Sequence, residues 1–86
     1  MGQPISFYRQ GERLSVNQIN PSKLLHSKWT AVKPVNKEKH FIVTDVEYDD
    51  DGNVIYCLIE AVLSSRSEAI DWKVLQNQAH WLHGWK

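Results

Sequence analysis

"HFIVTDVEYDDDGNVIYCLIEAVL", residues 40–63, predicts a β-hairpin, and this hairpin decides the fold. Residues 40–48 and 54–63 are rich in β-branched and aromatic side chains, which favour strands. Between them, "DDDGN" contains Asp-Gly and Gly-Asn pairs, which tolerate the positive φ angles of a tight turn. The strand over 54–63 is apolar on both faces for much of its length, which is typical of a central strand.

One further strand is predicted on each side of the hairpin. Before it, "KWTAVK" (28–33) reads as a strand that Pro34 stops, followed by the polar loop "VNKEK". After it, "AIDWKVL" (69–75) alternates apolar and polar residues, which is typical of a half-buried strand. This alternation makes Trp72 a core residue.

Two short helical turns flank these strands. The first is expected near 21–27, because Asn20 is a good N-cap and Pro21 suits the first helical position. The second is expected near 76–83, as a loop or short helical turn with Gly84 as a C-cap.

Together these elements predict a mainly β domain, a small antiparallel meander over residues 20–86. Because short strands must protect their edges, the compact solutions are an SH3-like barrel or a strongly bent sheet. A flat sheet with the helical turns covering one face is the alternative. Residues 1–19 lack clean periodicity and form a lead-in segment, for which flexible and ordered states both stay open.

Length and composition set limits on this domain. A chain of 86 residues buries a thin core, and nine aromatic residues, four of them Trp, enlarge it. The single cysteine, Cys57, excludes an intramolecular disulfide and favours a reducing compartment. No leader pattern and no run of about 18 apolar residues occurs, so we expect a cytoplasmic protein, monomeric and without a membrane partner.

Several motifs are similar to those of a known family. The segments "KLLHSKWTAVKPVNKEKHFIV", "EAVL", "IDW" and "HWLHGW" resemble a family of small tryptophan-rich bacterial proteins of unknown function. The resemblance covers residues 20–86, and one departure from the family pattern is Ile59, a conservative difference within a strand. It implies no activity, cofactor or catalytic residue.

Metal and enzyme functions are the least favoured. Placing Gly52 at the sixth position of a calcium loop puts Leu58 where the bidentate Glu is required. His80 and His83 lack further ligands at suitable spacing, and Cys57 lies in an apolar run unlike that of a reactive thiol. We therefore predict no metal ligands, no cofactor and no catalytic residues.

The charge distribution allows a nucleic-acid reading. Residues 21–40 hold five lysines against one acid, and residues 41–60 hold six acids without Lys or Arg, although the net charge is zero. A single-stranded nucleic acid could bind by phosphate attraction and by stacking on Trp29. This alternative uses Lys23, Lys28, Lys33, Lys37 and Lys39.

The favoured function is a non-catalytic interaction module that binds a protein or peptide partner through exposed aromatic residues. Small SH3-like domains hold extended peptides in aromatic-lined grooves, and Trp is a preferred hot spot. The candidate binding residues are Trp29, Trp81, Trp85, Lys28 and Lys33. Within the tail "HWLHGWK", we expect Trp81 to close the core and Trp85 to finish that lid or stand at its rim.

Overall fold

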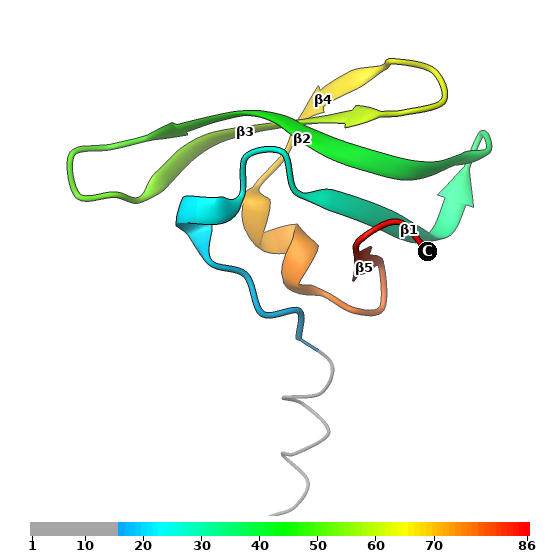
Figure 1. Ribbon diagram of the computed structural model, residues 1–86, viewed down its shortest axis with the longest axis horizontal. Helices are drawn as coiled ribbons and strands as arrows, with labels where there is room; N and C mark the ends of the chain where they lie inside the picture. The colour runs from blue at the N-terminus through cyan, green and yellow to red at the C-terminus, as the bar shows by residue number, and fades with distance from the viewer. Residues whose placement is uncertain (1–15) are drawn as a thin grey trace, which may run out of the picture.

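The computed structural model describes residues 16–86 and confirms a mainly β, antiparallel fold. Five strands form one open sheet in the order β4-β3-β2-β1-β5, with short 3-10 turns in place of longer helices among the described residues (Figure 1). The elements along the chain are η1 (Pro21–Lys23), β1 (Lys28–Val35), β2 (Glu38–Tyr48), β3 (Val54–Ala61), β4 (Ser67–Ala69), η2 (Trp72–Gln76) and β5 (Trp81–His83).

The predicted hairpin is confirmed as β2 and β3, paired from Phe41↔Ala61 to Tyr48↔Val54. Its turn is held by the Asp49 carboxylate, which accepts hydrogen bonds from the backbone N–H groups of Asp51 and Asn53. Gly52 adopts φ +83, a conformation that residues with a Cβ rarely reach. The turn residues recognised in the sequence therefore explain the β2–β3 hairpin, whose pairing is the longest in the sheet.

The loop predicted after Pro34 is a two-residue turn, so the prediction that β1 ends at Lys33 is wrong. Val35 and Glu38 pair directly, and the residues between them, Asn36 and Lys37, have φ values of 56 and 65. Two successive positive φ angles are the geometry of a type I′ hairpin turn. The last backbone hydrogen bond from β1 toward β5 is donated by the Val32 N–H to His80. Pro34 lies beyond it, at a position that needs no N–H donor, and is therefore tolerated.

The strand predicted over 69–75 is wrong in most of its length. β4 ends at Ala69, and a 3-10 turn follows because the Asp71 carboxylate accepts the N–H of Lys73 as an N-cap. The second helical turn is therefore η2 rather than a turn near 76–83, and residues 81–83 form β5 instead. The first helical turn is confirmed as η1, with Asn20 as its N-cap.

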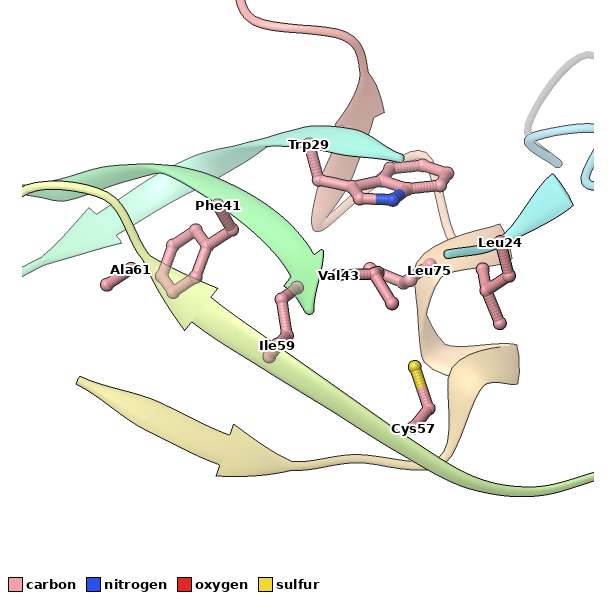
Figure 2. Close-up of a cluster of buried hydrophobic side chains, with 8 residues drawn as sticks. All are labelled: Leu24, Trp29, Phe41, Val43, Cys57, Ile59, Ala61 and Leu75. Atoms are coloured by element: carbon pink, nitrogen blue, oxygen red, sulfur yellow. The ribbon is translucent and has the colours of Figure 1, made fainter. Parts of the chain in front are cut away.

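The core lies between one face of the sheet and η2 (Figures 1 and 2). Figure 2 shows Phe41 and Ala61 at one end of this cluster and Leu24 and Leu75 at the other. Trp29 is its largest fully buried side chain. Trp72, predicted as a core residue, is half-buried and packs against the cluster from outside. The full set of buried apolar residues is Leu24, Trp29, Phe41, Val43, Cys57, Ile59, Ala61 and Leu75.

The described part of the predicted lead-in contacts η2. Val16 forms a bridge with Asn77, and Asn17 is buried with its side-chain amide donating to the carbonyls of Leu75 and Trp81. Residues 1–15 of the predicted lead-in lie outside the described residues. Over residues 16–86, no helix has the length and apolar character needed to span a membrane.

Candidate functional site

A cleft of about 330 Å³ opens on the core face of the sheet, between β5 and the segment around β4. Its floor is apolar and consists of Ala31 from β1, Phe41 from β2, Ile59 from β3 and Ile70 after β4. Charged side chains stand at its margin. An apolar floor with a few convergent polar groups is the usual composition of a ligand site. The complete lining is Ala31, Lys33, Val35, Glu38, Phe41, Ile59, Arg66, Glu68, Ile70, His80 and Trp81.

Trp81 forms the aromatic wall of this cleft. Its ring meets Phe41 edge-to-face, with centroids 5.1 Å apart and planes at 85°. β5 fixes this position, because Trp81 pairs with Ala31 of β1 in the sheet. Trp81 is half-buried, so the same ring packs against the core and faces the cleft.

A charged network closes one end of the cleft. Glu38 is 6% exposed and accepts hydrogen bonds from the Arg66 Nε and Nη2 atoms, the shortest at 2.7 Å, and from the Ser64 hydroxyl. Arg66 also binds Glu68 through Nη1 at 2.8 Å. The hydrogen bonds from Arg66, then that from Ser64, hold the pKa of Glu38 below its ordinary value of 4.5. The same carboxylates raise the pKa of Arg66, so this network stays ionised at neutral pH.

Lys33 and His80 complete the margin from β1 and from the residue before β5. Within residues 16–86, the only ion pairs are those of Arg66 with Glu38 and Glu68. Lys33 is thus an exposed cation at the cleft without a carboxylate partner in the described part of the chain. It can attract an anionic group of a ligand.

The structure separates the five candidate binding residues. Trp81 and Lys33 line the cleft. Trp29 is fully buried, with its ring stacked 4.6 Å from that of His83 and its indole N–H donating to Ser27, so its ring is not at the surface.

Lys28 and Trp85 lie together on the other face of the sheet. Lys28 neighbours Trp29 in β1, and successive strand residues point to opposite faces. The Lys28 ammonium stands 4.9 Å from the Trp85 ring centroid, and the His40 ring packs on the same indole at 5.8 Å. The indole N–H donates to the carbonyl of Phe41, yet Trp85 stays 44% exposed.

The lysines of the nucleic-acid alternative are spread over the molecule. Lys23 belongs to η1, Lys28 contacts Trp85, and Lys33 faces the cleft. Lys37 and Lys39 line a separate, smaller hollow with His40, Val62 and Leu63. Among the described residues, the cation–π contact of these lysines is that of Lys28, and its ring is Trp85 rather than Trp29.

Sequence reasoning missed most of the cleft. The sequence places Glu38 in the polar loop "VNKEK" and gives no sign that its partner is Arg66, 28 residues later. Phe41 was recognised only as part of a strand. The alternation along β1 and β2 could have placed Ala31 and Phe41 on the face of Trp29, but no local pattern brings Arg66 to Glu38.

The described residues contain no group of three or more His, Cys, Asp or Glu side chains suited to a metal ion. Cys57 is buried, and this burial raises the pKa of its thiol to about 11. A thiol of that pKa holds little thiolate at neutral pH, and the thiolate is the reactive form.

Comparison with known proteins gives one match. A family model described as "Tryptophan-rich protein (DUF2389)" matches residues 27–86, which include β1, the cleft and the tail with Trp81 and Trp85. This match confirms the resemblance drawn from the sequence motifs. No curated protein and no solved structure matches the chain.

Proposed function

We propose that this chain, which belongs to the tryptophan-rich family DUF2389, is a non-catalytic interaction module that binds a peptide segment of a protein partner. The cleft beside Trp81 is the proposed binding site. The observation that carries the proposal is the apolar floor of this cleft, open to solvent and walled by a half-buried Trp.

Size and chemistry support a peptide as the ligand. A volume of about 330 Å³ is at the lower end of ligand-binding pockets, and it suits one or two side chains of a partner. Trp and Arg are the residues most often found at binding hot spots, and Trp81 and Arg66 both line the cleft. The ion pairs of Arg66 pre-organise one margin, which lowers the entropy lost on binding.

The same proposal includes an SH3-like character for the sheet. β5 returns after a 3-10 turn to pair with β1, so the first and last strands are neighbours, which supports this reading. Domains of this kind hold extended peptides against aromatic side chains. We also propose a cytoplasmic location in a bacterial cell, since Cys57 is a free thiol and the family resemblance is to bacterial proteins.

Selection from a random peptide library tests the proposal. Phage displaying random twelve-residue peptides are selected on the immobilised full chain, and enriched peptides are synthesised and titrated by NMR. Binding in the micromolar range should shift the indole resonance of Trp81, because its ring walls the cleft.

Two matched variants locate the site. Val35→Lys changes an apolar residue that is 69% exposed at the cleft and should weaken binding about tenfold, or about 1.4 kcal/mol. Ile55→Lys makes the same type of change at a residue 63% exposed outside the cleft, and should leave affinity within twofold. The proposal fails if no peptide is enriched, or if the two variants weaken binding equally.

A second candidate function is supported by Trp85. We propose single-stranded nucleic-acid binding as the alternative, with Trp85 and Lys28 in place of the buried Trp29. Titration of a fluorescent twelve-nucleotide oligothymidine tests it, because phosphate contacts make affinity fall steeply with salt. Absence of binding at low salt would remove this alternative.

A further inference from the structure

The two edges of the open sheet differ in how their backbone groups are satisfied. β5 forms one edge, and its hydrogen bonds to β1 fall at His80 and Gly84, so the backbone groups of Trp81 point outward. These outward groups are occupied: the Trp81 N–H donates to the Asn77 carbonyl at 3.0 Å, and the Asn17 amide donates to the Trp81 carbonyl at 2.9 Å. The β5 edge is therefore closed at Trp81.

β4 forms the other edge. Of its flanking residues, Arg66 accepts a hydrogen bond from the Ala61 N–H of β3, and the Ile70 N–H donates one to the Cys57 carbonyl of β3, which sets the alternation along the strand. Ser67 and Ala69 are consequently the positions whose N–H and C=O groups point away from β3. No backbone or side-chain hydrogen bond from residues 16–86 satisfies these outward groups. Within the described chain, the β4 edge is open.

This open edge borders the cleft. Arg66, Glu68 and Ile70 alternate with Ser67 and Ala69 along β4, and all three line the cleft. A strand placed beside β4 would direct every second side chain to the same face of the sheet as Glu68. Those side chains would enter the cleft over Phe41 and Ile59, while the intervening ones would point to the opposite face.

We infer that the partner segment binds as a sixth strand hydrogen-bonded to Ser67 and Ala69 of β4. This inference rests on the proposed function and names the binding mode of the same site. Addition of a strand to a sheet edge takes affinity from main-chain hydrogen bonds and specificity from alternate side-chain pockets.

The cleft also defines the side chains of the segment. Phe41, Ile59 and Trp81 form an apolar surface that suits one apolar side chain of the segment. Lys33 is the charged group of the cleft without an ion-pair partner in residues 16–86. Because Arg66 is already held by two carboxylates, a carboxylate of the ligand is attracted to Lys33. The segment therefore carries an apolar residue and, two positions away, Asp or Glu.

Backbone methylation of a peptide from the library selection tests the pairing. A series of variants, each with one N-methylated amide, should lose affinity about tenfold at alternate positions and little between them, because only every second amide of an added strand faces β4. Hydrogen exchange of the full chain should show new protection at the Ser67 and Ala69 amides on binding. The Trp81 amide should show no new protection, because its N–H is already hydrogen-bonded to Asn77 in the free chain.

Protein variants give an independent test. Ala69→Pro removes an outward N–H while leaving the bonds to β3, and should weaken binding about tenfold; Ala69→Val keeps the N–H and should bind normally. Lys33→Glu should weaken binding about tenfold, whereas Lys39→Glu, outside the cleft, should not.

The outcomes separate this inference from the proposed function. Failure to obtain any peptide would refute the proposed function itself. A peptide that binds the cleft without alternation in the methylation series and without protection at Ser67 and Ala69 would refute only the strand addition. Protection of these two amides in the free chain would also refute it, since the edge would then be occupied by the chain itself or, if protection rises with concentration, by a second copy.

Discussion

Glu38 is the buried charged residue of the described chain, and its environment joins three segments. The carboxylate is held by Arg66 and Ser64 from the turn before β4, while Val35 pairs with Glu38 across the first hairpin. A buried carboxylate is stable only if its oxygens are fully hydrogen-bonded. Sequence alone suggested a solvated loop here, because the partner lies 28 residues away and no local pattern reports it.

Glu38 should make the stability of the fold sensitive to acid. Its pKa is lower in the folded chain than its ordinary value of 4.5, so it stabilises the fold above that pH. This contribution is lost as the pH falls from about 4.5 through the folded value. We expect Glu38→Gln to lower stability at pH 7 and to flatten the loss between pH 5 and 3, as followed by urea unfolding.

Glu47→Gln is the matched control, since Glu47 is an exposed residue of the same strand, without an ion pair in the described chain. Equal effects of the two substitutions at pH 7 would show that the Arg66 network contributes nothing to stability.

Trp29 shows what a residue pattern can and cannot tell. Its neighbours Lys28 and Lys33 suggested an exposed, basic aromatic site, yet its ring is fully buried. The alternation of β1 requires one face to be buried, but the sequence "KWTAVK" does not state which face. The pairing of Trp29 with Phe41 and His83 decides it.

At the scale of elements, those fixed by nearby residues could be predicted from the sequence, and those formed by contacts with distant residues could not. The β2–β3 hairpin was predictable because Asp49, Gly52 and Asn53 fix its turn within five residues. β5 was not predictable, since three residues are too few to show the alternation of a strand, and they become a strand by pairing with β1, about 50 residues earlier. η2 was mistaken for a strand because the Asp71 cap overrides the alternation that follows it.

Asn17 connects the N-terminal described segment with η2 and β5. Its side-chain amide makes two hydrogen bonds, to the carbonyls of Leu75 and Trp81, and Asn17 itself is 8% exposed. We expect Asn17→Ala to cost about 2 kcal/mol, because it removes the partner of the buried hydrogen bond to Leu75 and of the part-buried one to Trp81. Denaturant unfolding measures the cost.

The exposed neighbour Gln18 supplies the comparison, and Gln18→Ala should change stability by less than about 0.5 kcal/mol. If Asn17→Ala lowers the free energy of unfolding no more than Gln18→Ala does, water replaces the Asn17 amide fully as the hydrogen-bond donor to the two carbonyls.

At the scale of the whole molecule, the sheet depends on contacts between distant parts of the chain. His83 covers Trp29, and Trp81 covers Phe41, so the tail completes the core. A domain of this size has a thin core and depends on these contacts for its stability. Gly84 and Lys86 bind the Thr30 hydroxyl, and Trp85 binds the Phe41 carbonyl, which ties the tail to β1 and β2. The sequence motifs predicted an ordered tail, but not that it is a strand.

Removal of residues 80–86 should therefore unfold the domain rather than shorten it. The deletion exposes Trp29 and strips β1 of one neighbour, and we expect loss of the dispersed NMR spectrum at 25 °C. Trp85→Ala alone removes one 2.9 Å hydrogen bond and a half-exposed ring, and should retain the folded spectrum. A deleted chain with its full melting temperature would show that the tail does not close the core.

The difference between the two sheet edges also limits how copies of this protein could assemble. A fibre grows when the last strand of one copy pairs with the first strand of the next, which requires two open edges of different kinds. In the described chain, Asn17 and Asn77 occupy the outward groups of Trp81, so at this position β5 offers no free backbone group to a second copy. Pairing of β4 with β4 would consume the open β4 edge of both copies. The buried Asn17 thus blocks the Trp81 carbonyl from accepting a hydrogen bond from an added strand.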